Sequence, residues 1–438
     1  MTQRAPPHPT GTILDYLERG PDDLGAKPKQ GRAADYPLGL LYQGPWEEPG
    51  DGFCEHVRRV ARAIALVGCP VHLRSLRFRI GELATEVERT CAPLVRASIA
   101  RYSAYIQQVV PVPGALGQII LPSVVARRVL SDDDVRAMLR ARVVSTVWER
   151  WPPLPSDLAA LAAVGQVWVA CRDNARRLVA AGLDEPRVRV VPIPYFDDDP
   201  LVGKHLRPRV VGVPRFLHIG KWEPRKAQDR IVRAFLCAFR PSEAELVLKT
   251  AALSVPIADY PQGPNEAIRA ALAEARVQQN GWSAENVSQW LRVIVRRLSD
   301  QRIRELHELS DVYVSASRGE GFDMPAFDAK LAGNLLVYVP SGGPQDFASP
   351  ADECVAATGE VACHPLYGWG AGARYLDYDE EDLVRALQRA AGRVRAGRRH
   401  ETPALGGFRA EAVGALAVEH VRDLIRPWDG KVFEGDSP

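Results

Sequence analysis

The chain has 438 residues, a formal net charge of +2 and 25% charged residues. This length allows two domains that each have a full hydrophobic core. The small net charge gives no overall field that would attract DNA or RNA, so we expect no nucleic-acid partner. No 18 apolar residues follow one another, and the first 34 residues contain no apolar segment, so we expect neither a transmembrane helix nor a signal peptide.

Cysteine usage indicates the cellular compartment. Seven cysteines are scattered along the chain, and no two of them form a C-x-x-C pair. An odd number of dispersed cysteines is typical of reduced, mostly buried thiols in a cytoplasmic protein. We therefore expect a cytoplasmic location, while peripheral association with a membrane and a homodimer both remain open.

Strand and helix patterns alternate along the chain, which predicts α/β domains with parallel sheets and crossover helices. After an N-terminal extension at 1–34, we expect the first domain at 35–200. Its first strand is predicted at 36–42, and a Gly-containing loop leads from there to a helix at 54–67 with apolar residues on one face. A strand at 166–171, a helix and a final strand at 188–194 are predicted to complete this domain.

A polar, proline-containing stretch at 196–213 predicts the linker between two domains. It contains three consecutive aspartates at 197–199, for which a metal site is the alternative interpretation. Consecutive side chains rarely point together at one ion, so we interpret this stretch as a solvated linker.

The second domain is expected at 201–407 and begins with a buried strand at 216–219. A helix follows, with apolar residues at 231, 234, 235 and 238. The loop between strand and helix contains one glycine, Gly220, and three cations, Lys221, Arg225 and Lys226. Lysine supplies a point charge and arginine a forked donor, which suits a diphosphate, whereas a solvated basic turn is the alternative.

An insertion at 254–290 carries several prolines and a predicted helix at 265–278. An inert surface elaboration is the more frequent role of such a segment, and a lid or a wall of the acceptor site is the alternative. Further buried strands are predicted at 293–298 and 312–315.

The segment 317–334, SRGEGFDMPAFDAKLAGN, is the most informative part of the sequence. It follows a predicted strand, and Pro325 stands where a first helical residue would be, so a helix is predicted to start near Met324. Glycines at 319 and 321 allow the backbone to approach a ligand closely, and a helix start offers free amides to an anion.

Two carboxylates, Glu320 and Asp328, belong to the same strand–turn–helix unit. Carboxylates beside an anion-binding helix start predict a site for a phosphorylated sugar. The alternative is a structural Gly-rich turn in which Asp323 caps the helix.

These motifs carry a resemblance to a known family. The run Glu320, GFDMPAF, Asp328 resembles the E-x7-E signature of retaining glycosyltransferases of family four, and GKWEPRKA at 220–227 resembles their basic loop. The resemblance is strongest over 215–346. It implies the GT-B fold, in which two Rossmann-like domains with parallel sheets face a central cleft and a C-terminal helix, here within 408–438, crosses back to the first domain.

The resemblance also implies roles for individual residues. Lys226 and Lys221 would grip the donor diphosphate, Glu320 would face the sugar, and Asp328 would contact the ribose. The remaining donor-binding candidates are Gly220, Arg225, Gly321, Phe322, Asp323 and Met324, with Arg296 and Leu298 at the nucleobase. Candidates on the acceptor side are Gly52, Phe53, Trp148 and Glu149.

Four positions depart from the family pattern. Lysine replaces arginine at Lys221, aspartate replaces glutamate at Asp328, and glycine is replaced at both Ala227 and Asp323. A carboxylate at position 323 lies beside the expected diphosphate, and we interpret it as a ligand of a sugar hydroxyl or as a helix cap.

We therefore expect a retaining glycosyltransferase that moves a sugar from a UDP- or GDP-sugar to a small-molecule or glycan acceptor. The nucleoside-diphosphate sugar would be a co-substrate, and no metal or other cofactor is expected. A non-catalytic nucleotide-sugar-binding protein and a nucleotide-sugar epimerase are the alternatives. A base on the acceptor side is not required, although His56 and His72, which flank the first helix, are candidates for one.

Overall fold

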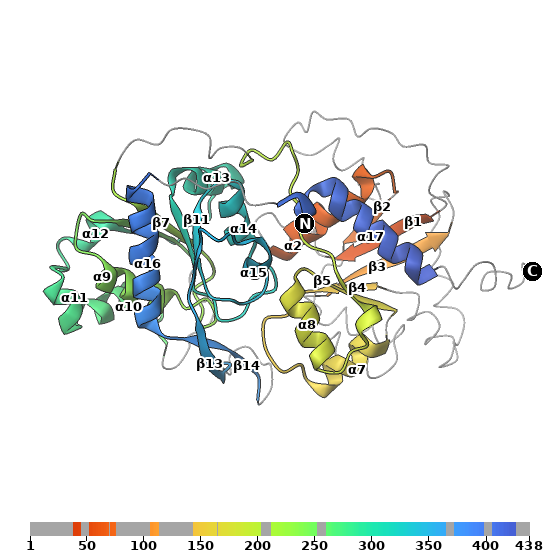
Figure 1. The fold of residues 1–438 in the computed structure, drawn as a ribbon, viewed down its shortest axis with the longest axis horizontal. Helices are drawn as coiled ribbons and strands as arrows, with labels where there is room; N and C mark the ends of the chain where they lie inside the picture. Colours follow the sequence, from red (N-terminus) through yellow and green to blue (C-terminus); the bar gives the residue numbers. More distant parts are fainter. Residues whose placement is uncertain are drawn as a thin grey trace, which may run out of the picture.

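The computed structural model describes residues 38–44, 52–69, 71–75, 106–113, 143–163, 165–202, 212–251, 260–364, 372–397 and 405–425. These residues form two α/β domains that lie next to each other, each built on a six-stranded sheet (Figure 1). The predicted N-terminal extension lies outside the described residues.

The N-terminal sheet has the strand order β2-β1-β3-β4-β5-β6. Its strands run parallel except β3, which is antiparallel to both of its neighbours. The bounds are β1 Leu38–Gly44, β2 Val71–Ser75, β3 Ile106–Pro113, β4 Val143–Thr146, β5 Gln166–Val169 and β6 Val188–Val190. The helices are α2 Gly52–Leu66, α7 Pro155–Ala163 and α8 Arg172–Ala180, with a 3-10 turn, η2, at Glu185–Arg187.

The C-terminal sheet is parallel throughout and has the order β12-β11-β10-β7-β8-β9. Its strands are β7 Arg215–Ile219, β8 Glu245–Lys249, β9 Leu291–Ile294, β10 Val312–Ser315, β11 Leu335–Tyr338 and β12 Glu353–Cys354. Numbered within the domain, this is the Rossmann order, and the direction of strand succession reverses between β7 and β10. Ligands of open α/β sheets bind at this reversal, beyond the carboxyl ends of the strands.

Helices cover both faces of the C-terminal sheet. Their bounds are α9 Gln228–Ala238, α10 Pro264–Leu272, α11 Ala275–Gln279, α12 Val287–Trp290, α13 Asp300–Leu309, α14 Met324–Leu331, α15 Pro344–Phe347 and α16 Glu380–Arg395. Alternate strand residues separate the two cores, because Phe216 and Leu246 pack with α9 and α16 while Leu217 and Val247 pack on the side of α14. This alternation is what a sheet buried on both faces requires.

The insertion at 254–290 is not a lid where the structure describes it. Both α10 and α11 pack against α9, and Ala271, Val277 and Trp282 belong to the core of the C-terminal domain. In Figure 1 these helices lie at the end of this domain that is remote from the N-terminal domain. The alternative of a lid or acceptor wall therefore has no support for 260–290, because the apolar faces of its helices pack against α9 and the core of the domain.

The last helix, α17 (Ala410–Ile425), leaves the C-terminal domain after the 3-10 turn η5 (Leu405–Phe408) and packs along α2 (Figure 1). Val413, Ala417 and Val421 meet the apolar face of α2 in one cluster. Together with the two Rossmann-like domains, this crossing confirms the expected GT-B architecture.

The three aspartates between the domains have separate partners. Asp197 accepts a hydrogen bond from Arg409, Asp198 forms an ion pair with Arg62 at 2.7 Å, and Asp199 accepts the amide of Leu201 at 3.0 Å. Because the three side chains do not converge, the metal-site alternative has no geometric support. Two of the three instead connect this stretch to α2 and to the start of α17.

A hairpin of β13 (Ala357–Ala362) and β14 (Arg374–Tyr378) extends from the C-terminal domain. Arg374 and Trp151 of the N-terminal domain exchange two backbone hydrogen bonds, at 2.8 and 2.6 Å. The hairpin therefore connects to the N-terminal domain through backbone pairing, next to the segment 147–151.

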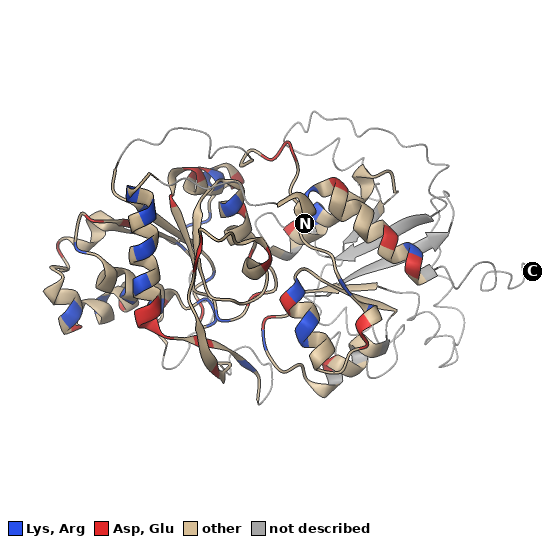
Figure 2. Cartoon of the chain, viewed as in Figure 1, with Lys and Arg blue, Asp and Glu red and all other residues tan. Residues whose placement is uncertain are grey.

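Charged side chains of both signs are interspersed over the two domains (Figure 2). Along α16 they are ordered, with acidic residues in the first turn and arginines in the last, as the helix macrodipole favours. Within the described ranges, no helix combines the length and the apolar character needed to cross a membrane. Among the cysteines of the described residues, Cys54, Cys69 and Cys171 are buried.

The contact between α17 and α2 provides a test of the crossover. A β-carbon added at Gly414 would lie 2.1 Å from the carbonyl oxygen of Ala63, whereas one added at Gly392 of α16 would meet nothing within 4 Å. We expect Gly414→Ala to lower the free energy of unfolding by about 1 to 3 kcal/mol, because the backbone of α2 must move away. The matched control Gly392→Ala should raise it by about 0.5 to 1 kcal/mol through helix propensity. Urea unfolding of both variants measures the difference, and equal stabilities would contradict the packing.

Candidate functional site

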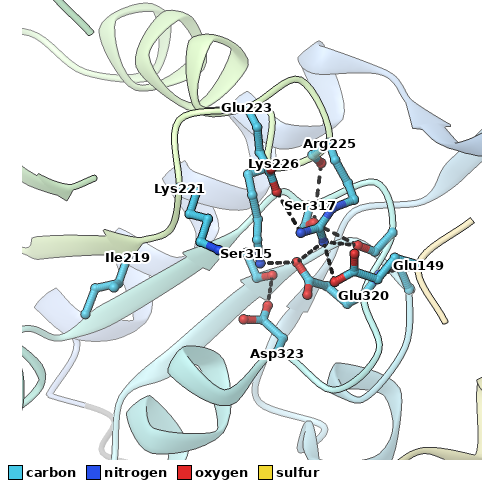
Figure 3. Close-up of polar contacts among 12 residues, drawn as sticks. Glu149, Ile219, Lys221, Glu223, Arg225, Lys226, Ser315, Ser317, Glu320 and Asp323 are labelled. Atoms are coloured by element: carbon cyan, nitrogen blue, oxygen red, sulfur yellow. Dashed lines mark hydrogen bonds and ion pairs between the residues drawn. The ribbon is translucent and has the colours of Figure 1, made fainter. Parts of the chain in front are cut away.

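Two loops meet at the reversal point of the C-terminal sheet. The loop after β7 carries Lys226, the loop after β10 carries Glu320, and the ammonium and carboxylate groups of these residues form an ion pair (Figure 3). The residues are 94 positions apart in the sequence. The strand order brings together the basic loop and the carboxylate motif, which the sequence presents as separate features.

Arg225 fixes the conformation of the second loop. Its side chain donates to the carbonyl of Gly319 at 2.5 Å, and its own carbonyl accepts the amide of Arg318 at 2.8 Å and the hydroxyl of Ser317 at 3.3 Å. Its guanidinium also forms ion pairs with Glu320 at 3.3 Å. Arg225 is 7% exposed and both of its terminal nitrogens contact protein groups, so it holds the loop together and is not a free cation for a diphosphate.

The same guanidinium has two further carboxylate partners. Glu223 lies 2.7 Å away in its own loop, and Glu149 lies 3.2 Å away and comes from the N-terminal domain. Glu149 and Glu320 are thus both held by one arginine, across the boundary between the domains (Figure 3).

Two residues other than glycine have a left-handed backbone conformation in the loops of this site. Ala227 has φ 52° and Asp323 has φ 64°, both in the left-handed region that favours glycine. A non-glycine residue in this region costs of order 1 kcal/mol. The left-handed backbone at Ala227 and Asp323 therefore lowers the stability of the fold.

Asp323 is buried at the start of α14. Its carboxylate accepts the hydroxyl of Ser315 instead of making a regular capping hydrogen bond to the helix. Burial, with a contribution from nearby Glu320, raises the pKa of Asp323 to about 6. Asp323 thus occupies the N-cap position that the sequence predicted, and the amide of Ala326 in the first turn of α14 acts to lower its pKa.

The charges of the cluster do not balance. Glu149, Glu223, Glu320 and Asp323 are acidic, whereas the cations in direct contact with them are Arg225 and Lys226. Burial opposes the charge of Glu320, but Lys226 and Arg225 outweigh it and hold the pKa of Glu320 below its ordinary value. Burial raises the pKa of Glu149 to about 7, an effect that Arg225 only partly offsets. The excess acidity therefore falls on Glu149 and Asp323.

The glycines of the motif serve the contact between the domains. A β-carbon at Gly319 would lie 2.0 Å from the carbonyl oxygen of Glu149, and one at Gly321 would lie 2.2 Å from Cβ of Val147. Their side-chain-free surfaces are thus occupied by the segment that follows β4. The prediction that they admit a ligand needs correction, because the approaching backbone belongs to the N-terminal domain.

Several residues that support this loop had no signal in the sequence. Asn174 of α8 donates to the carbonyl of Glu320 at 3.4 Å and accepts the amide of Trp148 at 2.8 Å. The hydroxyl of Ser341 accepts the amide of Glu320 at 3.0 Å. Asp346 of α15 accepts the amide of Arg172 at 2.8 Å, at the start of α8. Each is far in sequence from its partner, so no local pattern could indicate it.

Asp328 does not join the cluster. The guanidinium of Arg59 on α2 binds both of its carboxylate oxygens, at 3.0 and 3.4 Å. A β-carbon at Gly52, the first residue of α2, would lie 3.4 Å from the methyl group of Met324. The N-terminal ends of α2 and α14 therefore lie against each other, and the candidate ribose ligand has a cationic partner from the other domain.

α14 itself is anchored by a buried ion pair. Lys330 binds Asp352 at 2.8 Å, and neither side chain is exposed to solvent. Asp352 also accepts the amide of Leu336 at 2.7 Å, so the pair connects the helix to β11. This rigid attachment fixes the helix start that carries the amides of the candidate site.

The remaining candidates lie at different distances from the cluster. Lys221 is exposed and extends from the same loop as Lys226 (Figure 3). Phe322 packs among the rings of Phe327, Phe347 and Phe408, which leaves its main chain for any donor contact. Arg296 is exposed and Leu298 half-buried, beyond the end of β9.

On the acceptor side, the ring of Trp148 packs in the core of the N-terminal domain, while Glu149 reaches the cluster. The side chains of Phe53 and His72 lie outside the described residues. His56 and His218 are buried, and burial lowers the pKa of each to about 4. His218 donates to the carbonyl of Val314 at 2.7 Å, which makes it a packed histidine.

Comparison with known proteins concerns the fold. No family model and no curated protein sequence matches this chain. Among solved structures, Anabaena HepE in complex with UDP and glucose has 12% identity and a TM-score of 0.45, over 87% of this chain and 99% of that one. A glycosyltransferase from Rickettsia africae has 13% identity and a TM-score of 0.44, over 63% of this chain and 69% of that one. Sucrose-phosphate synthase from Thermosynechococcus elongatus has 17% identity and a TM-score of 0.42, over 62% and 61%. At such identities the likeness is one of fold, and the chemistry must be argued from this site.

The raised pKa of Asp323 makes a stability prediction. Its folded-state pKa of about 6 exceeds the ordinary 3.8, so the fold prefers the protonated form. The stability that this preference provides is full below about pH 4 and is lost as the pH rises through about 6. Asp323→Asn keeps an acceptor for Ser315 and carries no charge, so it should equal the wild type near pH 4 and exceed it by about 1 to 3 kcal/mol at pH 8. Unfolding midpoints measured across this range test it, and parallel curves for the two proteins would contradict a buried, disfavoured carboxylate.

Proposed function

We propose that this protein is a retaining glycosyltransferase that moves a sugar from a nucleoside-diphosphate sugar to an acceptor without a metal ion. The observation that carries the proposal is the contact between Lys226 and Glu320 at the reversal point of the Rossmann-like sheet. A cation and a carboxylate side by side at a helix start match the two charges that develop when a glycosyl–phosphate bond breaks.

When the donor binds, Lys226 would exchange its ion pair with Glu320 for one with the diphosphate. Lys226 and the exposed Lys221 come from one loop, and the start of α14 adds free amides and the positive end of its dipole. These groups would stabilise the negative charge that grows on the leaving diphosphate, and such preorganised electrostatics is usually the largest catalytic term. The main chain at Gly220 and Met324 would contact the donor.

Glu320 would face the sugar once Lys226 has turned to the diphosphate. Arg225 would stay in place, because it is held by Gly319 and Glu223 as well as by Glu320. Glu320 would therefore remain ionised and oriented beside the anomeric carbon, where positive charge develops. Asp323 would meet a sugar hydroxyl, and Asp328 would meet the ribose after giving up Arg59.

The N-terminal domain would bind the acceptor. Glu149 of this domain belongs to the cluster, and Gly52 at the start of α2 faces α14. The nucleobase would lie towards Arg296 and Leu298 beyond β9. No cofactor is needed besides the nucleotide sugar, because the cations of the chain neutralise the diphosphate.

The central test is the substitution Lys226→Ala. Loss of one cation at the leaving group should reduce donor turnover by about 10²- to 10³-fold, by analogy with the removal of an oxyanion donor. Nucleotide release from a panel of UDP- and GDP-sugars measures turnover, and the thermal midpoint checks that the variant is folded. The matched control is Arg302→Ala, which removes an exposed cation on α13 that pairs with Glu305.

A Lys226→Ala variant with wild-type turnover would refute the assignment. Stabilisation of the wild type by UDP or GDP with no release from any donor would favour the non-catalytic binding protein. Conversion of the nucleotide sugar in the absence of an acceptor would favour the epimerase.

A further inference from the structure

Of the four carboxylates in the cluster, Glu149 alone comes from the N-terminal domain. Its side chain is 20% exposed and lies 3.2 Å from Arg225, and its carbonyl oxygen packs on Gly319, next to Glu320. The carboxylate therefore stands between the part of the chain that would bind the acceptor and the carboxylate that would face the sugar. An acceptor that reaches the anomeric carbon from the N-terminal domain would pass it.

The position of Glu149 is set by contacts on both of its sides. The amide of Trp148 donates to Asn174 at 2.8 Å, and Trp151 exchanges two backbone hydrogen bonds with Arg374 of the hairpin. Both contacts are unrelated to the charge of Glu149. The backbone thus holds this carboxylate in place even when its ionisation changes.

Glu149 can exchange a proton near neutral pH. Burial raises its pKa to about 7; Arg225 and Lys226 lower it, while Glu320 and Glu223 raise it. A general base works best when its pKa lies near the working pH. The other candidates are less suited, because the pKa of Glu320 is held low by two cations and the buried histidines His56 and His218 have pKa values of about 4.

Resting on the proposed function, we propose that Glu149 is the general base for the acceptor and that Arg225 is its positioning residue. In the step, the acceptor O–H bond breaks and its proton moves to the Glu149 carboxylate. For retention, the acceptor oxygen forms its bond to the anomeric carbon on the face from which the diphosphate leaves. The bond between that carbon and the diphosphate oxygen breaks, and its electron pair leaves with the diphosphate.

Arg225 contributes by geometry. It touches both Glu149 and Glu320, at 3.2 and 3.3 Å, so it holds the base and the sugar-side carboxylate at a constant separation. Its charge also lowers the pKa of Glu149, against the effect of burial. When Lys226 turns to the donor, Arg225 is the cation that remains between the two carboxylates.

The experiment compares two nucleophiles on the donor that the wild type binds from the UDP- and GDP-sugar panel. Water must lose a proton as it attacks, whereas azide carries none. We expect Glu149→Gln and Glu149→Ala to lose about 10²- to 10⁴-fold of the hydrolytic rate, the usual contribution of a general base. Sodium azide should restore nucleotide release in Glu149→Ala, with glycosyl azide as the product.

Two controls separate catalysis from structure. Glu305→Gln removes a glutamate of α13 that pairs with Arg302 outside the cluster, and it should keep the hydrolytic rate and show no azide effect. Stabilisation by the free nucleotide should be equal in the wild type and the Glu149 variants, because Glu149 touches no donor group. Arg225→Lys should shift the pH midpoint of hydrolysis, whereas a merely structural role would change only the thermal midpoint.

The wild type gives a further readout that needs no variant. Its hydrolysis should fall as the pH drops through about 7, while its reaction with azide should not follow that midpoint. Unchanged hydrolysis in Glu149→Gln, or failure of azide to restore release, would overturn the role of Glu149 and leave the transferase standing. Absence of nucleotide binding and release in the wild type would overturn both.

Discussion

The hydrogen bond from Arg225 to the carbonyl of Gly319 is the contact on which the candidate site depends. It joins the loop after β7 to the loop after β10, and the same guanidinium holds Glu320 and Glu149. An arginine suits this place because its planar fork can satisfy several acceptors at fixed angles, which a lysine cannot do. The neighbouring Lys226 has a flexible stem and one main partner, Glu320. Arg225 therefore supports the loops, while Lys226 can change partners.

The cluster contains several features that lower the stability of the fold. Two non-glycine residues stand in the left-handed region, and two carboxylates have pKa values raised by burial. A protein selected for stability alone would replace such groups. Their concentration at one point, beside a helix start and at the reversal of a parallel sheet, is the arrangement expected where charge must be created and moved.

Contacts between the domains pass through the same few residues. The glycines at 319 and 321 pack against the segment after β4. Asp328 forms an ion pair with Arg59, and Asp346 accepts a backbone amide at the start of α8. Any rearrangement of the domains would therefore change the surroundings of both signature carboxylates. The crossing of α17 onto α2 adds an apolar contact that does not depend on the site.

The local strands, turns and helices of the site follow from the sequence alone. Period and turn chemistry predicted the strand, turn and helix at 312–331 and at 215–238, because these depend on neighbouring residues. Tertiary structure decided what these units do. It turned the motif glycines into an interface, gave Asp328 an ion pair, made Arg225 a support for the loop and brought Glu149 to Glu320. Strand order and packing set these relations between residues tens to hundreds of positions apart, and no local pattern encodes them.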